Sequence, residues 1–378
     1  TGITMLSGLD EMPPSLLLWR SLTQWFGGLG ILSFVLAMLR SRPHLQSLLS
    51  AESHKIHTPR PEPGAAHTLR IFLSIYLGWT LAVAIGLFLC GYSIFDAINH
   101  ALTTLSTGGF SPHDQSIAYF QGQADTAHVV AEWIIIAGML AGGTSFMVHY
   151  RLFRGEARAL WDRGETRLWW VILVTALGLI IIEQSGDGAF GELSEGIRSS
   201  VFQVVAIATT TGYATEDIAS PAYGAAARQL FLMLMLIGGM VSSTGGGFKV
   251  LRALLLGKLF TRLLFRILAP RGARTGVRYA ESLVSEEELS RVTALFFAWL
   301  ALLAIGSLST ALLTQHGAIE STSGMLSALS NIGPCFIPVE DMANLPAGIK
   351  LIYTLGMLAG RLEVIPIVLL FVPAAWRR

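Results

Sequence analysis

Residues 95–111 read FDAINHALTTLSTGGFS, a short and weakly amphipathic stretch that runs into hydroxyl side chains and two glycines. Residues 199–215 (SSVFQVVAIATTTGYAT) and 320–336 (ESTSGMLSALSNIGPCF) have the same form. In each stretch about a dozen residues precede the loop glycine. A helix of that length rises about 18 Å, too little to cross a hydrocarbon core of about 30 Å. The pattern predicts three half-helices that each end in a glycine loop.

Long apolar segments flank each of these stretches. The chain is 52% hydrophobic and 13% charged, whereas soluble domains carry about 25% charged residues. Residues 71–92 and 292–314 contain no charged residue and are long enough to span a membrane. Shorter or interrupted apolar runs occupy residues 22–39, 129–150, 168–182, 230–248 and 351–373. We therefore expect about seven spans in an all-α polytopic membrane protein.

Arginine and lysine are unevenly distributed between the ends of these spans. Of the 26 in the chain, 21 lie in residues 40–70, 151–167, 249–291 and 377–378. The segments that hold the glycine loops contain only Arg198. Basic loops stay on the cytoplasmic side of a membrane, so the glycine loops are expected to open outward. The basic residues flank spans without interleaved aromatics, which argues against nucleic-acid binding.

The first ten residues, TGITMLSGLD, match the loop end of a fourth copy, whose half-helix and leading span would lie upstream of Thr1. The loop glycines then fall at 2, 108, 212 and 333, at intervals of 106, 104 and 121 residues. A patch of small residues follows each glycine: FGGLGIL, AGMLAGG, IGGMVSS and LGMLAGR. We expect a pseudo-fourfold repeat of span, half-helix and span around one ion pathway, with the first repeat incomplete.

This repeat divides the chain into six parts. They are the end of repeat 1 (1–40), a cytoplasmic linker (41–69), repeat 2 (70–153), repeat 3 (154–261), a cytoplasmic loop (262–288) and repeat 4 (289–378).

The glycine loops have a composition suited to a bare monovalent cation. Non-helical backbone at membrane depth is tolerated only where protein buries it or where it lines a watery cavity. Glycine reaches positive φ without penalty, so successive carbonyls can turn inward and replace a hydration shell. A divalent site would want carboxylates, and the four loops carry none. A single loop alone would fit an ordinary re-entrant turn equally well. The predicted filter residues are Thr1, Gly2, Thr107, Gly108, Thr211, Gly212, Ile332 and Gly333.

Residues 243–248, STGGGF, nearly repeat the STGGF of 106–110 but lie inside an apolar span. Each glycine costs a helix roughly 1 kcal/mol relative to alanine, and the hydroxyl residues compete for backbone hydrogen bonds. The helix is therefore expected to break here. A phosphate-binding loop would need Gly-Lys-Ser/Thr after a strand, whereas Phe248 separates Gly247 from Lys249. We do not expect an enzyme.

Two cations near this break admit two interpretations each. Lys249 is either a residue that reaches the cytoplasmic edge or a cation that holds the broken segment. Arg361 lies within the last span, where a charge costs at least ~2.5 kcal/mol. Glu363 is two residues on and therefore on another helix face. Arg361 either acts at the ion pathway or pairs with another span.

The chain resembles the Trk/Ktr/HKT superfamily of potassium transporters, most of all its bacterial Trk branch. The motifs that carry the resemblance are TGITMLSGLD with QWFGGLGI, STGGFSPHD, ATTTGYAT, SSTGGGFK, and NIGPCF with GRLE. It covers essentially the whole chain and implies potassium uptake across the cytoplasmic (inner) membrane. In the plant branch a serine at the first filter position goes with sodium preference, so Gly2 favours potassium. Tyr213, Pro334 and Ile332 depart from fourfold symmetry, which keeps a sodium-selective or non-selective monovalent cation transporter as the alternative.

The resemblance also implies roles beyond the filter. It makes Arg361 a residue that tunes flux below the filter, and it assigns an intramembrane gate to Ser243, Thr244, Gly245, Gly246, Gly247 and Lys249. It implies K+ as the transported ion, no covalent cofactor, a homodimer, and cytosolic nucleotide-binding regulatory subunits. The basic segments 154–167 and 262–291 are their docking candidates, and RTGVRY (274–279) is a candidate hairpin. Channel-like transport, coupling to protons or sodium, and a membrane scaffold without transport remain open.

Overall fold

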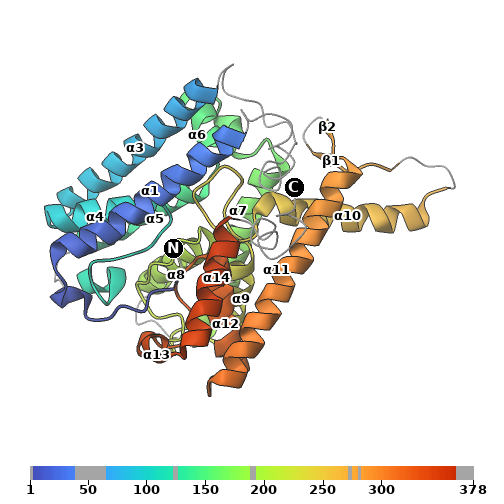
Figure 1. The fold of residues 1–378 in the computed structure, drawn as a ribbon. Coiled ribbons are helices and arrows are strands. Elements are labelled where there is room, and N and C mark those ends of the chain that lie inside the picture. Colours follow the sequence, from blue (N-terminus) through green and yellow to red (C-terminus); the bar gives the residue numbers. More distant parts are fainter. Residues whose placement is uncertain are drawn as a thin grey trace, which may run out of the picture.

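The computed structural model describes residues 3–38, 65–121, 127–187, 193–270, 275–279 and 282–362. Thr1 and Gly2 of the predicted filter lie outside these residues, as do most of the linker 41–69 and the end of repeat 4. The elements are η1 (Leu9–Glu11), α1 (Pro14–Met38), α3 (Ala65–Leu89), α4 (Ile94–Leu105), η2 (Ser116–Phe120), α5 (Ala127–Gly143), α6 (Phe146–Phe153), η3 (Ala157–Leu160), α7 (Gly164–Asp187), α8 (Leu193–Ala208), α9 (Ala225–Leu236), α10 (Val250–Leu268), β1 (Arg278–Tyr279), β2 (Ser282–Leu283), α11 (Glu286–Leu313), α12 (Ala318–Ser330), α13 (Val339–Asn344) and α14 (Ala347–Leu362) (Figure 1).

The all-α prediction is confirmed, and the three half-helices are present as α4, α8 and α12. The Ser93 hydroxyl caps the start of α4 by accepting the N–H of Asp96 at 3.0 Å. Asn331 ends α12 in the left-handed conformation, with φ 59°. The longest of the three, α8, has 16 residues and rises about 24 Å, still less than a bilayer core.

Three described helices, α3, α7 and α11, are long and apolar enough to cross a membrane as single rods. Helices α5 and α6 are long and apolar enough only together, and they meet at an angle of 107°, as in a broken span or a re-entrant loop. The apolar run over 129–150, given above among the shorter or interrupted ones, is interrupted between these two helices. The α5 carbonyls of Gly142 and Gly143 accept N–H groups from Thr244 (3.1 Å) and Met240 (3.0 Å), so they do not continue the helix. We call residues 143–146 the elbow.

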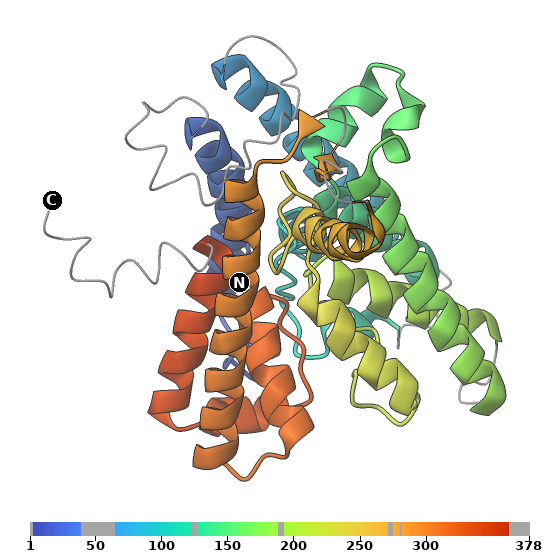
Figure 2. The same cartoon turned by 90° about the vertical axis from the view of Figure 1, so that its right-hand side faces the viewer.

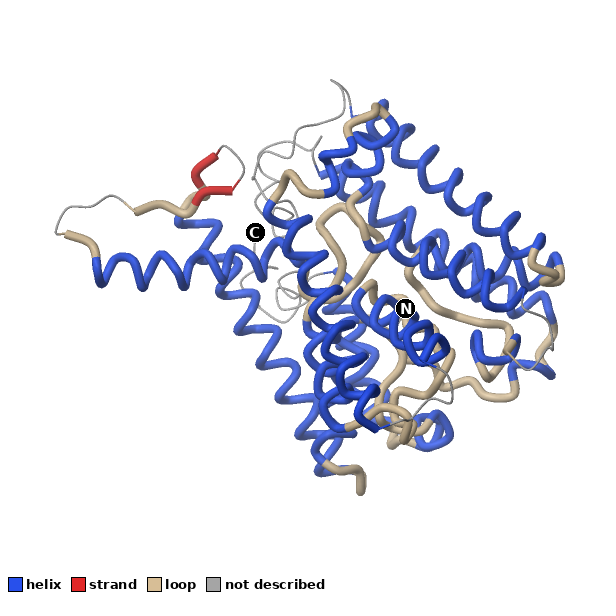
Figure 3. The backbone as a smooth tube through the Cα atoms, turned by 180° about the vertical axis from the view of Figure 1, so that it is seen from behind, coloured by secondary structure: helices blue, strands red, loops and turns tan. Residues whose placement is uncertain are grey.

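The helices pack as two groups with loops between them. Helices α1, α3, α4 and α5 lie together on one side of the molecule, and α9, α11, α12 and α14 lie together on the other (Figures 1 and 2). Loops occupy much of the space between the groups when the chain is viewed from behind (Figure 3). Each group has its own buried apolar cluster. The two halves therefore face each other across non-helical backbone.

The basic segment after the helix break projects from this body. Helix α10 runs outward past α11 and exposes Phe260, Phe265 and Leu268 (Figure 1). The candidate hairpin is present but short: β1 and β2 are antiparallel with two residues each, and Arg278 pairs with Leu283.

Small residues let the spans approach the half-helix ends. A Cβ built on Gly142 would lie 2.8 Å from the Thr107 methyl and 3.0 Å from the Leu105 carbonyl oxygen. By contrast, a Cβ on Gly178 of α7 would meet nothing within 4 Å. The glycine patch of repeat 2 is therefore a contact surface for the end of α4.

We predict opposite effects of alanine at these two helical glycines. Gly142→Ala should lower the free energy of unfolding by about 1–2 kcal/mol, because the new methyl overpacks fixed backbone. Gly178→Ala should raise it by up to about 1 kcal/mol through helix propensity. Thermal unfolding of the purified protein in detergent measures both. Equal stability of the two variants would contradict the contact described for Gly142.

Candidate functional site

The glycine loops of repeats 2, 3 and 4 lie edge to edge. A Cβ built on Gly109 would lie 1.9 Å from the carbonyl oxygen of Thr211, and one built on Gly212 would lie 1.9 Å from that of Ile332. No side chain fits at either contact. The structure thus brings together Thr107, Gly108, Thr211, Gly212, Ile332 and Gly333 of the predicted filter.

The loop N–H groups bond back to the half-helix that precedes each loop. Gly108 donates to the Thr103 carbonyl at 2.8 Å and Gly212 to the Ala206 carbonyl at 3.0 Å. In the third loop, Gly333 donates to the Ser327 hydroxyl at 3.0 Å. Gly212 (φ 78°) and Gly333 (φ 118°) adopt the backbone region that favours glycine. The donors of these loops are therefore engaged on the half-helix side.

Repeat 1 contributes to the candidate site through α1, although its own predicted filter residues, Thr1 and Gly2, lie outside the described part of the chain. The Gln24 amide donates to the Gly108 carbonyl at 2.9 Å, and its oxygen accepts the Phe110 N–H at 3.2 Å. Sequence reasoning missed Gln24. It lies two residues before the small-residue patch of α1. Its role in holding the second loop is seen only from its hydrogen bonds to that loop in the structure.

A cavity of about 450 Å³ opens beside these loops. Gly108, Gly212 and Gly333 line it, together with Ile3 and Thr4, which follow the first predicted filter glycine. Three acidic residues of the loops also face the cavity, namely Asp114, Glu216 and Asp217. All four repeats therefore reach one space.

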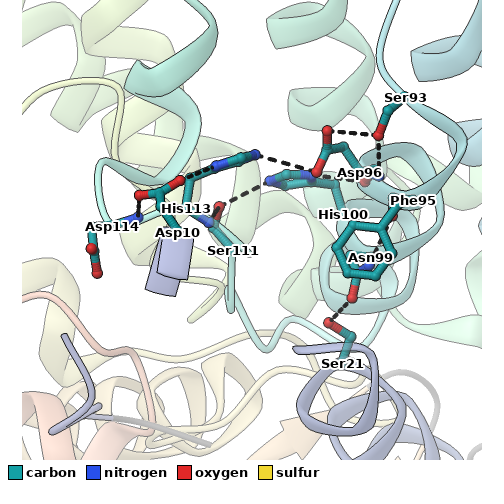
Figure 4. A network of polar contacts seen from close by, with 10 residues as sticks. All are labelled: Asp10, Ser21, Ser93, Phe95, Asp96, Asn99, His100, Ser111, His113 and Asp114. Atoms are coloured by element: carbon teal, nitrogen blue, oxygen red, sulfur yellow. Dashed lines mark hydrogen bonds and ion pairs between the residues drawn. The ribbon is translucent and has the colours of Figure 1, made fainter. Parts of the chain in front are cut away.

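A polar network beside this cavity ties the first loop to the second (Figure 4). The His113 ring contacts Asp10 of η1 at 2.5 Å and Asp96 of α4 at 3.3 Å. Asp114 accepts the Leu9 N–H at 3.0 Å. Burial alone would lower the pKa of His113, but the two carboxylates outweigh it and raise that pKa. When protonated, His113 thus acts as a clasp between repeats 1 and 2.

The helix break predicted at 243–248 is present but begins earlier, and it extends over residues 237–249. We call these residues the gate segment, after the role expected for residues 243–249. Helix α9 ends at Leu236 and α10 begins at Val250. The Thr244 hydroxyl donates to the Leu105 carbonyl at 2.8 Å, and the Gly246 N–H donates to the Thr210 hydroxyl at 2.6 Å. A Cβ on Gly246 would lie 2.6 Å from the Ser330 carbonyl oxygen. The segment therefore meets the ends of all three half-helices.

Two cations hold neighbouring carbonyls of the gate segment. The Arg361 guanidinium donates to the Thr244 carbonyl at 2.8 Å, and the Lys249 ammonium donates to the Gly245 carbonyl. The Lys249 contact matches the interpretation in which that cation holds the broken segment, whereas the Arg361 contact fits both of its interpretations. Among the described residues, no cluster of three His, Cys, Asp or Glu side chains is arranged to hold a metal ion.

A buried ion pair links repeats 2 and 3 away from the loops. Arg198 of α8 donates to the Glu132 carboxylate at 2.7 Å, and the Glu132 side chain is 1% exposed. Gln121 donates to the same carboxylate at 2.8 Å. A charge buried at this depth requires such partners. Sequence reasoning gave no signal for this pair, since its members are 66 residues apart.

Comparisons with known proteins agree over the whole chain. The family model described as TrkH, cation transport protein, matches residues 1–163 and 164–378. The Trk system potassium uptake protein TrkH of Escherichia coli K12 is 31% identical over 100% of this chain and 77% of its own length. TrkI of Halomonas elongata, also named a Trk system potassium uptake protein, is 34% identical over 100% and 75%. The crystal structure of the potassium transporter TrkH from Vibrio parahaemolyticus matches with a TM-score of 0.85 and 28% identity, over 100% of this chain and 76% of that one.

The His113 clasp predicts a pH-dependent stability. A raised pKa adds stability that is fully present below the unfolded value near 6.5 and is lost as pH rises through the folded value. The thermal midpoint should therefore fall by on the order of 2 °C between about pH 6 and pH 9 because of this group. In His113→Asn that contribution should vanish, and Asp10→Asn should reduce it. Equal pH profiles for wild type and His113→Asn would refute the clasp.

Proposed function

The chain belongs to the TrkH family of cation transport proteins, and from this premise we propose that it takes up potassium across the cytoplasmic membrane. In this proposal four glycine loops form the selectivity filter and the gate segment closes the pathway beneath them. The observation that carries it is the edge-to-edge contact of three glycine loops beside a cavity that all four repeats line.

The engaged N–H groups support selection of a cation. Because the loop donors bond back to the half-helices, they leave loop carbonyl oxygens for a cation, and such oxygens can replace a hydration shell. The Gly108 oxygen also accepts the Gln24 amide, and its second lone pair stays available. The half-helices α4, α8 and α12 also direct the negative ends of their dipoles at the loops. The filter residues themselves carry no carboxylate, which fits a monovalent ion better than a divalent one.

The gate proposal is supported by the position of residues 237–249. The segment lies against the half-helix ends, where it would obstruct an ion that has passed the filter. The Arg361 and Lys249 cations hold it in place and would repel a permeating cation. Opening then requires that the segment leave these contacts, and its three consecutive glycines permit the change of backbone conformation.

The cytoplasmic face is where we propose regulation. The resemblance to Trk systems supports a homodimer and cytosolic nucleotide-binding subunits similar to TrkA. The inner loop around η3 and the segment that holds β1 and β2 are their docking surfaces in this proposal. Sodium-selective or non-selective transport is the alternative, because Ile332 and Pro334 make the filter asymmetric.

The filter is tested by matched glycine substitutions. Gly212→Ser places a side chain against the Ile332 carbonyl at a φ of 78°, and should reduce labelled rubidium uptake at least about tenfold. Gly91→Ser has a similar φ of 88° but open space around it, and should stay within about twofold of wild type. Uptake is measured in cells that lack other potassium transporters, with sodium as competitor. Normal growth and uptake with Gly212→Ser would refute the filter, and sodium uptake equal to rubidium uptake would favour the alternative.

The gate is tested by removing residues 245–247. The deletion eliminates the Lys249 contact and shifts the Arg361 contact, each a charge-assisted hydrogen bond worth roughly 1.5–3 kcal/mol. Basal rubidium flux in proteoliposomes should therefore rise at least about tenfold. Gly257→Ala, in open space on α10, serves as the control and should leave the flux unchanged. An unchanged flux after the deletion would show that this segment does not obstruct the pathway.

A further inference from the structure

Glu165 has a buried carboxylate that has no role in the filter or the gate as proposed above. It lies in the first turn of α7 with 6% of the residue exposed. Its carboxylate accepts the backbone N–H of Val241 at 2.7 Å. Arg163 and Lys249 interact with it electrostatically. Burying a carboxylate costs free energy unless it is paired or hydrogen-bonded. The burial of Glu165 against the Val241 N–H therefore calls for an explanation.

Val241 lies in the first part of the gate segment, where three successive residues are each held from outside. The Met240 N–H donates to the Gly143 carbonyl at 3.0 Å, and the Ser242 carbonyl accepts the Phe146 N–H at 2.9 Å. Both of these partners are backbone groups of the elbow. Between them, Val241 is held by the Glu165 side chain. Of the three anchors, Glu165 is the one that a side-chain movement can release.

The same carboxylate faces the cytoplasmic hairpin. Tyr279 of β1 is 2% exposed, and it interacts electrostatically with Glu165. Val277 and Val284 beside the hairpin share an apolar cluster with Phe248, near the other end of the gate segment. The hairpin is therefore linked to the end of the segment through the apolar cluster with Phe248. It is linked to Val241 through the interaction of Tyr279 with Glu165, which accepts the Val241 N–H.

We propose that Glu165 is a positioning residue that keeps the gate segment closed and couples the cytoplasmic hairpin to it. This inference rests on the proposed function, since it needs residues 237–249 to be the gate. A movement of the hairpin withdraws Tyr279 from the carboxylate and loosens the apolar contact with Phe248. The segment is then released near both ends at once. A cytoplasmic regulator that displaces the hairpin opens the pathway without touching the filter.

The test compares two carboxylates at opposite ends of α7. Glu165→Ala removes the acceptor for Val241, whereas Glu183→Ala removes the acceptor for Ala226 (2.8 Å) and Ala227 (2.7 Å) at the start of α9. Basal rubidium flux is measured with full-length protein in proteoliposomes. Glu165→Ala should raise it about tenfold with an unchanged rubidium-to-sodium ratio, and Glu183→Ala should leave it unchanged. A rise of equal size in both variants would mean general loosening and would overturn the inference.

Conservative variants test the coupling itself and guard against misfolding. Glu165→Gln retains an acceptor oxygen and should raise the flux less than Glu165→Ala. Tyr279→Phe removes one hydroxyl and should raise it about threefold. The double variant Glu165→Ala/Tyr279→Phe should leak no more than Glu165→Ala, because the tyrosine acts through the carboxylate. Additive effects in the double variant would refute the coupling.

The deletion of residues 245–247 separates this inference from the gate proposal. If the deletion leaks while Glu165→Ala and Glu165→Gln do not, the gate stands and the role of Glu165 is wrong. If neither the deletion nor the Glu165 variants leak, the gate proposal itself fails.

Discussion

Non-helical backbone in the middle of a membrane must have its N–H groups bonded, and this constraint organises the described structure. The filter loops meet it by bonding their donors back to the half-helices, as Gly108 does to Thr103. The gate segment satisfies the constraint by donating its N–H groups to acceptors outside the segment, including the Gly143 carbonyl of the elbow and the Thr210 hydroxyl. In the loops the donors bond within their own repeat, and in the gate segment they hold the chain against the half-helix ends.

The same constraint explains why helices are interrupted in pairs. The bend between α5 and α6 leaves the carbonyls of Gly142 and Gly143 available, and the break between α9 and α10 supplies the matching N–H groups. Either interruption alone would leave unpaired polar backbone at depth. The two are therefore parts of one structure. The Thr244 hydroxyl, bonded to both Leu105 and Gly142, joins this structure to the end of α4.

Local features could be predicted from the sequence, and long-range contacts could not. The half-helices and the break after α9 follow from length, glycine content and hydroxyl residues, which act over a few neighbouring positions. The elbow could not be placed within the run 129–150 because it depends on contacts with residues about 100 positions away. Gln24 and Glu165 carry no local signal either. The filter and gate roles, the homodimer and the regulatory subunits remain predictions.

Each of the three described loops contacts a group that precedes it in the sequence. Gln24 of repeat 1 holds the Gly108 carbonyl of repeat 2, and the Tyr213 hydroxyl of repeat 3 bonds to the His100 carbonyl of repeat 2 at 3.1 Å. Gly212 in turn lies against Ile332 of repeat 4. Each of these three loops thus contacts a part of the chain that is synthesised before it. During biogenesis these contacts can therefore form in the order of synthesis, and the contact between Gly212 and Ile332 forms only after the last repeat has been made.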